Sequence, residues 1–235
     1  MLAFALAQVL MLAAHAPAAP QSDAARAYRR EFENERVRVT RVRYEPREKL
    51  PTHDHPDSAT VYVYLRDSGP VRFVHTGEEA FTLVRPAVRA GGFRLSRGAK
   101  ETHSVESLTD LPTDFLRVEL KGLTDAERRT FRGRFPPAAR GRGAQQVRFE
   151  NARVRIARVT CAARRRCDGL GGAGTASLLV ALAPARLRSA DGGTEVSMAL
   201  GETMWAEAGG APSFVNVAGA AAEFLRIDLK SGPGR

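Results

Sequence analysis

Short runs of β-branched and aromatic residues alternate with turn-forming residues along most of the chain. In the first half these runs occupy residues 37–44, 59–65, 70–75, 81–84 and 114–120. Glycine-containing turns separate several of them, for example at residues 67–69 and 90–92. Short runs of this composition, bounded by turn signals, are typical of β-strands. Because no long amphipathic helical pattern accompanies them, we predict an all-β sandwich or barrel.

Two stretches of sequence recur and divide the chain into similar halves. Residues 32–43 (FENERVRVTRVR) and 149–160 (FENARVRIARVT) are identical at eight of twelve positions and lie 117 residues apart. Residues 115–121 (FLRVELK) and 224–230 (FLRIDLK) are identical at five of seven positions and lie 109 residues apart. Such a repeat, opening and closing each half, indicates two copies of one β domain.

The repeat also gives the expected domain boundaries. We predict an N-terminal domain over residues 29–121 and a C-terminal domain over residues 147–230. The segment between them, residues 122–146, is rich in Gly, Pro and Arg, so we predict a linker there. Thr124 and Glu127 have the spacing of a capping box, which predicts a short helix at its start.

The N-terminus indicates the compartment. Residues 2–14 are apolar apart from one glutamine, and small residues follow them. This pattern is typical of a secretory signal peptide over residues 1–18, with cleavage before Ala19. A single membrane anchor or a buried helix is the alternative, but the apolar core is short for a membrane span. We therefore expect a periplasmic or secreted protein without a stable membrane span.

Composition narrows the class of ligand. The 235 residues include 36 basic and 26 acidic ones, which gives a formal net charge of +10, and 32 of the basic residues are arginines. These arginines are scattered through the predicted strands, aromatic residues make up only 7% of the chain, and no nucleic-acid motif is present. Nucleic-acid binding is therefore not expected. The positive charge favours a small anionic ligand, and a homodimer is left open.

The two cysteines, Cys161 and Cys167, have a spacing that matches neither a zinc site nor a redox motif. In an exported protein they are able to form a disulfide, whereas in the cytosol they would be two thiols. We expect a structural or incidental role for them.

Four of the five histidines lie in the first domain: His53, His55, His75 and His103. His53 and His55 are two residues apart, so their rings share a face if the segment is extended. A barrel that brings His103 beside them would create a site of three imidazoles, which suits several divalent metals. The alternative is that His53 and His55 are exposed turn residues and His103 is a buried hydrogen-bonding residue. We expect His75 at a strand end on the surface.

This pattern resembles the cupin superfamily, in particular a two-domain bicupin. The first cupin motif, G-x5-H-x-H-x3-4-E-x6-G, is matched at His53, His55 and Gly69, but the position of its glutamate falls at Ala59 or Thr60. The second motif, G-x5-P-x-G-x2-H-x3-N, is matched mainly at its histidine, His103. Together with the repeat, the resemblance implies two tandem cupin-like (double-stranded β-helix, or jelly-roll) barrels.

The resemblance also implies a divalent metal ion (Fe, Mn, Zn or Ni) bound by His53, His55 and His103. Because the motif glutamate is absent, the site has either three histidines or a substitute carboxylate. Glu101 lies two residues before His103 and is the candidate fourth ligand. The second domain has no histidine, so we expect it to be a degenerate, structural cupin unit.

Three functions are open at this point. The first is a metal-dependent small-molecule enzyme of the dioxygenase or isomerase type, in which Tyr62, Tyr64 and Glu101 are candidate acid–base groups without an assigned role. Arg94 and Arg97 are candidates for binding a carboxylate. The second is a non-catalytic module that binds a small molecule or a carbohydrate. The third is a protein-interaction scaffold.

Overall fold

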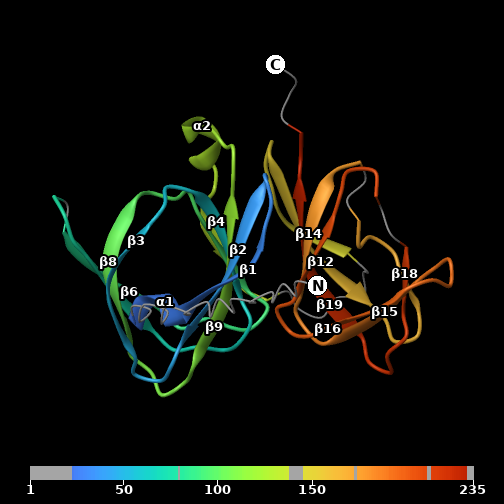
Figure 1. Cartoon of the computed structure of the whole chain (residues 1–235), viewed down its shortest axis with the longest axis horizontal. Helices are drawn as coiled ribbons and strands as arrows, with labels where there is room; N and C mark the ends of the chain where they lie inside the picture. Colours follow the sequence, from blue (N-terminus) through green and yellow to red (C-terminus); the bar gives the residue numbers. More distant parts are fainter. Residues whose placement is uncertain (1–22, 79, 138–144, 172–173, 211–212, 232–235) are drawn as a thin grey trace, which may run out of the picture.

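The computed structural model describes residues 23–78, 80–137, 145–171, 174–210 and 213–231. The signal peptide predicted over residues 1–18 lies outside these ranges and stays a prediction. Within the described part of the chain, no helix is long and apolar enough to cross a membrane. The described residues form two β domains that lie side by side (Figure 1). The prediction of an all-β architecture is therefore confirmed.

The first domain consists of two facing antiparallel sheets. The six-stranded sheet has the order β1 (Tyr28–Glu33), β2 (Val37–Tyr44), β9 (Thr113–Leu120), β4 (Ala59–Tyr64), β7 (Phe93–Ser96) and β10 (Gly133–Phe135). The four-stranded sheet has the order β3 (Lys49–His55), β8 (Glu101–Ser107), β5 (Val71–His75) and β6 (Phe81–Arg85). A short helix, α1 (Asp23–Ala27), contacts β1, β2 and β3.

The second domain repeats this arrangement. Its five-stranded sheet has the order β11 (Gln145–Glu150), β12 (Val154–Cys161), β19 (Ala222–Leu229), β14 (Ala176–Ala181) and β17 (Thr203–Ala206). Its smaller sheet has the order β13 (Arg166–Cys167), β18 (Phe214–Asn216), β15 (Ala185–Ser189) and β16 (Glu195–Met198). The larger sheet thus has the order of the first five strands of its N-terminal counterpart.

The two repeated stretches meet in space within each domain. In the first, the Asn34 side chain accepts hydrogen bonds from the backbone of Arg36 and Val37, both at 2.9 Å, and so closes the turn between β1 and β2. Lys121, the last residue of the second stretch, donates to the carbonyl of Asn34 at 2.7 Å. Lys230 makes the equivalent contact with Asn151 at 2.8 Å. The repeated Asn and Lys therefore fasten the outer hairpin to the central strand.

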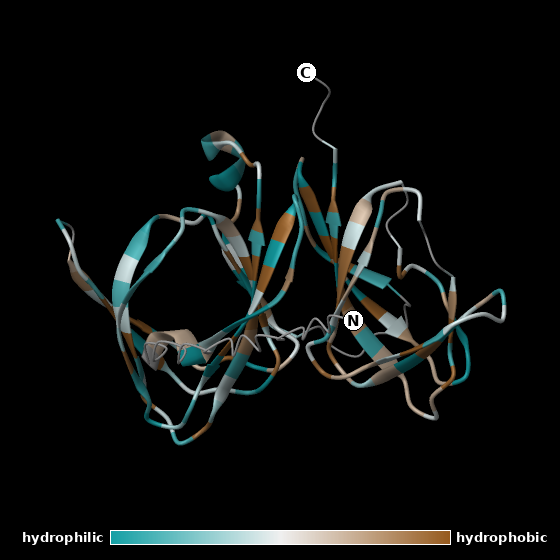
Figure 2. Cartoon of the chain, viewed as in Figure 1, coloured by the Kyte–Doolittle hydropathy of each residue, from teal (hydrophilic) through white to brown (hydrophobic). Residues whose placement is uncertain are grey.

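The two larger sheets pack against each other and form a core shared by both domains. Alternate residues of β2, β4 and β9 face alternate residues of β12, β14 and β19. Figure 2 shows hydrophobic residues concentrated on these strands, where the domains meet. Strand β9 is consequently buried along its whole length. Its other face, which carries Phe115, Arg117 and Glu119, points into the first barrel.

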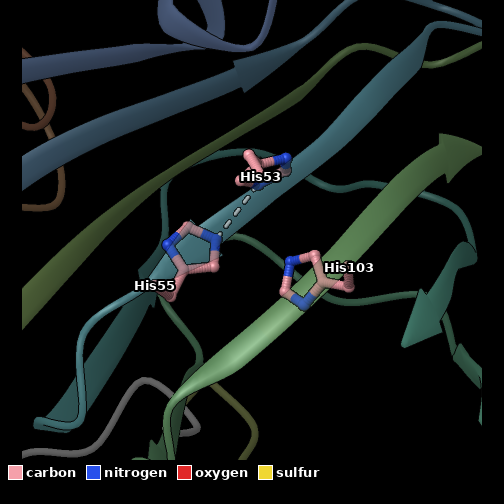
Figure 3. Close-up of side chains that lie close together, drawn as sticks. All are labelled: His53, His55 and His103. Atoms are coloured by element: carbon pink, nitrogen blue, oxygen red, sulfur yellow. Dashed lines mark hydrogen bonds between the residues drawn. The ribbon is translucent and has the colours of Figure 1, made fainter. Parts of the chain in front are cut away.

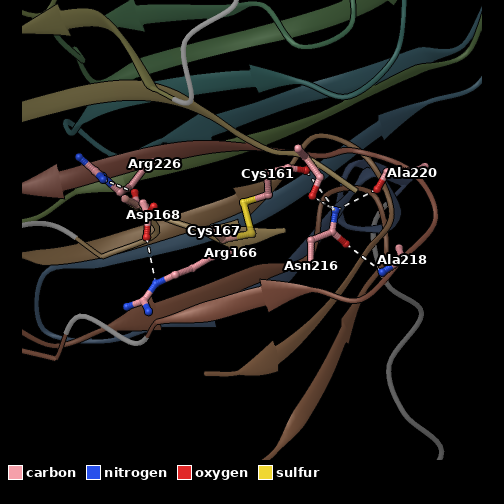
Figure 4. Close-up of a disulfide and its surroundings, with 10 residues drawn as sticks. Cys161, Arg166, Cys167, Asp168, Asn216, Ala218, Ala220 and Arg226 are labelled. Atoms are coloured by element: carbon pink, nitrogen blue, oxygen red, sulfur yellow. Dashed lines mark hydrogen bonds and ion pairs between the residues drawn. A yellow bond between two sulfur atoms is a disulfide. The ribbon is translucent and has the colours of Figure 1, made fainter. Parts of the chain in front are cut away.

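The interiors of the two barrels differ. The second is filled by a continuous apolar cluster that includes Leu170, Leu179 and Phe224. The Cys161–Cys167 disulfide lies in this cluster, and nearby Asn216 donates to the carbonyl groups of the surrounding loops (Figure 4). The first barrel has a smaller apolar cluster, so polar side chains occupy the rest of its interior.

The segment predicted as a linker contains regular structure. Helix α2 (Asp125–Arg128) begins with the predicted capping box, in which Thr124 and Glu127 bond to each other's backbone N–H groups. Strand β10 then joins the first domain by pairing with β7, and Phe135 stacks on Phe93 with their ring centroids 4.6 Å apart. A three-residue strand that depends on this long-range pairing carries little local signal in the sequence.

Candidate metal centre

Strand pairing brings together histidines that are about fifty residues apart in the sequence. Strands β3 and β8 are neighbours, with His53 opposite His103 and His55 opposite Glu101. The register shifts between Leu50 and His53. Pro51, which has no N–H group to donate, lies within this irregularity, as is typical of proline in sheets. The bulge helps to direct the rings into the barrel.

The three histidines predicted as ligands lie together. One nitrogen from each of His53, His55 and His103 falls within 4.8 Å of the other two. The Nε2 atoms of His53 and His55 are 3.1 Å apart. Figure 3 shows the three rings converging from β3 and β8 on one point between the strands. His53 and His55 lie half-buried on β3 and not in an exposed turn. His103 is buried, at 2% exposed, but neither of its ring nitrogens has a hydrogen bond among the described residues.

Glu101 lies elsewhere in the cluster. It belongs to a second group, with His75 and His103, and does not join the group of three histidines. Its Oε2 atom is 3.5 Å from Nδ1 of His103. Beside Nδ1 of His103, this carboxylate is placed to orient that imidazole, and with His75 and His103 it also has the spacing of metal ligands. The geometry therefore places Glu101 behind His103.

His75 is buried, at 7% exposed, so the expectation of a surface residue was wrong. Two neighbours account for the difference. β5 pairs with β8 so that His75 lies opposite His103, and Phe81 of β6 stacks on its ring at a centroid distance of 4.2 Å.

The protonation of the rings suits metal binding. Burial lowers the pKa of His53, and burial together with the charge of Arg117 lowers the pKa of His55 to about 2. Both rings are therefore neutral at physiological pH, the form that binds metals. The Nδ1 atom of His53 donates to the carbonyl of Pro51 at 2.9 Å. This bond makes Nε2 of His53, on the inner side, the nitrogen whose lone pair accepts a hydrogen bond or binds a metal.

His103 provides the test of whether the site fits a metal. Its Nδ1 and Nε2 atoms are both buried, and neither has a hydrogen-bond partner among the described residues. An unpaired buried polar group costs about 1–3 kcal/mol. A cation bound to one nitrogen, with Glu101 beside the other, would satisfy the ring. The donor set and this unpaired ring therefore fit a divalent metal.

Arg117 on β9, in contrast, opposes metal binding by His55. Its Nη1 atom contacts Nδ1 of His55, and its Nη2 atom pairs with Oε1 of Glu119 at 3.0 Å. An imidazole that binds a metal through Nε2 holds its proton on Nδ1, where this guanidinium lies. A bound ion would therefore require Arg117 to move off the ring. The sequence gives no sign of this contact, although Arg117 lies in the repeated FLR triplet.

A small cavity adjoins the histidines inside the first barrel. It offers about 60 Å³ to water-sized molecules and is lined by His55, His103, Glu101, Tyr62, Arg85 and Arg94. One ordered water needs about 10–15 Å³ by the same measure, so the cavity suits a ligand of a few heavy atoms. Arg97, the other predicted carboxylate-binding residue, is exposed and lines a separate groove.

Two arginines in this cavity have buried guanidinium nitrogens that no carboxylate pairs with in the described part of the chain. Arg94 is 9% exposed and its guanidinium lies 3.9 Å from the ring centroid of Tyr62. Its Nε and Nη2 atoms and the Nε atom of Arg85 are buried and without hydrogen bonds in the described part of the chain. Burial, and then the charge of Arg94, lowers the pKa of Arg85. Two unpaired guanidinium groups make the cavity suitable for an anion.

The second barrel has no comparable site. Among its described residues, no group of three metal-ligating side chains is present. Leu170, which aligns with His53 through the repeat, is part of the apolar core. Arg226, the counterpart of Arg117, bonds to Asp228 at 2.9 Å and contacts the carbonyl groups of Gly169 and Gly171. The space that holds the histidines and the cavity in the first barrel is filled with core and backbone in the second.

Comparison with known proteins shows the fold. No protein-family model matches the sequence, and no curated protein matches it either. Among solved structures, the YhaK protein of Escherichia coli matches with a TM-score of 0.56 and 13% identity, over 83% of this chain and 86% of that one. A cupin 2 conserved barrel domain protein of Leptotrichia buccalis matches at 0.50 and 13%, over 86% and 88%.

Oxalate decarboxylase of Bacillus subtilis, a protein with Mn(II) centres, matches with a TM-score of 0.53 and 13% identity, over 94% of this chain and 80% of that one. These similarities extend over both domains. The chain therefore has the two-domain cupin fold, as the histidine motifs and the repeat predicted.

Proposed function

We propose that this chain is an exported metalloenzyme that binds one divalent metal ion through His53, His55 and His103 and acts on a small carboxylate held beside it. The observation that carries the proposal is the juxtaposition, in one barrel, of three converging imidazoles and a cavity lined by two arginines with buried nitrogens that lack hydrogen bonds among the described residues. The similarity to a manganese-containing decarboxylase supports a divalent metal in this fold.

The residues of the cavity and the metal have different roles in this proposal. Arg85 and Arg94 supply guanidinium groups that bind a carboxylate and orient it toward the histidines. When bound, the metal supplies a Lewis acid for the oxygen atoms of the substrate or a site for dioxygen. The small volume excludes bulk water, which strengthens these electrostatic contacts.

Glu101 is the acidic side chain in the lining of the cavity. Burial opposes its ionisation, but the neighbouring His103 ring and the charge of Arg85 hold its pKa below the usual value. Glu101 is therefore ionised and is the best-placed proton acceptor for a bound substrate. This role takes it out of the metal's coordination sphere, where the sequence had placed it.

Two features support export to an oxidising compartment. One is the predicted signal peptide over residues 1–18. The other is the disulfide between Cys161 and Cys167, since disulfides persist mainly in secreted and periplasmic proteins. Fractionation of cells that express the full chain tests this part of the proposal. Full-length, unprocessed protein in the cytosol would contradict it.

The competing function is a binding module without turnover, and the contact of Arg117 with His55 is the observation that favours it. One experiment distinguishes the enzyme from the binding module. The protein is loaded with Fe(II), Mn(II), Ni(II) or Zn(II), and small mono- and dicarboxylates are screened for oxygen uptake, CO₂ release and isomerised products. The enzyme proposal predicts turnover that Glu101→Gln abolishes while carboxylate binding is retained. Carboxylate binding without turnover under any of the four metals would establish the binding module instead.

A further inference from the structure

A tyrosine from outside the predicted motifs reaches the centre of the histidine cluster. Tyr28 is the first residue of β1, directly after α1. Its hydroxyl is 2.9 Å from Nε2 of His53 and 3.5 Å from Nε2 of His55. Because Nδ1 of His53 carries the proton that bonds to Pro51, the Nε2 atom of His53 accepts and the phenol donates.

The spacing of these three atoms is that of ligands around a single cation. Donor atoms at about 2.1 Å from a metal lie roughly 2.9 to 3.4 Å from one another in octahedral or tetrahedral geometry. Two of the three separations, 2.9 and 3.1 Å, fall in this range, and the third, 3.5 Å between Tyr28 and His55, lies just above it. An ordinary hydrogen bond from a tyrosine to one histidine would not require its oxygen to approach the second Nε2 as well.

The repeat provides an internal control for this position. Tyr28 lies opposite Val42 in the first domain, and Gln145 lies opposite Val159 in the second. Tyr28 and Gln145 are 117 residues apart, and so are Val42 and Val159. Gln145 is therefore the counterpart of Tyr28. With its amide oxygen turned inward, Gln145 accepts from Nη2 of Arg226 at 3.2 Å. The fold therefore does not demand a tyrosine here, and the tyrosine occurs in the domain that has the histidines.

From these observations we infer that Tyr28 is the fourth protein ligand of the metal, in a chain that lacks the cupin glutamate. This inference rests on the proposed metal site. On binding, the phenol O–H bond is replaced by a bond from the oxygen to the metal, and the proton is released to solvent. The site is then three imidazoles and one phenolate, a donor set that favours trivalent iron and other hard, oxidised metals more than three imidazoles alone.

The test is the optical spectrum of the full chain loaded with Fe(II) and oxidised to Fe(III). A tyrosinate bound to Fe(III) gives an intense visible charge-transfer band, which imidazole ligands do not. We expect this band in the wild type and its loss in Tyr28→Phe. Tyr44→Phe is the matched control, because its hydroxyl is 3.2 Å from that of Tyr28 but makes no hydrogen bond to the histidines in the described structure; it should retain the band.

The possible outcomes distinguish the Tyr28 ligand from the three-histidine metal site. Stoichiometric iron without the band in the wild type, or a band that persists in Tyr28→Phe, overturns the tyrosine ligand and leaves the histidine site standing. Failure of the folded wild type to bind iron or any other divalent metal overturns both proposals. If Tyr28→Phe does not fold, resonance Raman spectra of the wild type and of Tyr44→Phe decide: tyrosinate vibrations in both support the ligand, and their absence from the wild type refutes it.

Discussion

The two unpaired arginines lead to a prediction in which stability and function change in opposite directions. Arg94 is buried, and its Nε and Nη2 atoms lack hydrogen bonds among the described residues. Each unpaired buried group costs about 1–3 kcal/mol, while the guanidinium over Tyr62 returns at most about 2 kcal/mol. Arg94→Met keeps the apolar stem and removes the unpaired atoms. We therefore expect its free energy of unfolding to rise by about 1–2 kcal/mol.

The same substitution should weaken carboxylate binding. Hydrogen bonds to charged groups contribute about 1.5–3 kcal/mol, so the affinity for oxalate or malonate should fall roughly 10- to 100-fold. Urea unfolding measures the first effect and isothermal titration calorimetry the second. Arg97→Met is the matched control, since Arg97 is exposed three residues away, and both quantities should stay near wild type. An Arg94→Met protein that is less stable and binds carboxylates normally would refute the assignment of an anion site.

Three further predictions concern metal affinity, the disulfide and pH. The double variant Arg117→Gln/Glu119→Gln removes the cation beside His55 without leaving a buried carboxylate unpaired. Its metal affinity, measured by competition with a chelator, should be about tenfold higher than that of the wild type. Unchanged or weaker binding would contradict the role given to Arg117. Replacing Cys161 and Cys167 with alanine should lower the free energy of unfolding by about 2 kcal/mol and leave the metal content unchanged. Loss of metal would show that the metal site of the first barrel depends on the disulfide of the second. His55 has a pKa of about 2 in the folded chain and about 6.5 when unfolded, so between these values the unfolded chain binds a proton that the folded chain does not. The metal-free protein should therefore lose up to about 1.4 kcal/mol of stability per pH unit as the pH falls below 6.5, with a flatter dependence in His55→Gln; equal slopes would show that this ring is not buried and neutral.

The fold could be predicted because its signals are local or repeated. The strands were visible as short apolar runs, and the FEN and FLR stretches recurred because each domain uses them at the same turn and central strand. The trio of His53, His55 and His103 could be predicted because alternation along an extended segment and one distant histidine match the cupin motifs.

The remaining features of the site depend on burial and on long-range packing. Arg94 was a candidate together with the exposed Arg97, and Arg85 was not, because nothing in the sequence distinguishes an arginine with buried, unpaired nitrogens from an exposed one. Tyr28 precedes the first repeated stretch and reaches the histidines only because β1 lies along the edge of the larger sheet. His75 was misplaced because the ring of Phe81 covers it from a neighbouring strand.

The most direct test of the central claim is the metal content of the purified chain, measured by mass spectrometry beside three variants. We expect close to one divalent ion per wild-type chain and none in folded His53→Ala or His103→Ala. Lys100→Ala, at an exposed position just before β8, should retain the metal. Folded wild-type protein that holds no metal after reconstitution with Fe(II), Mn(II), Ni(II) and Zn(II) would contradict the central claim.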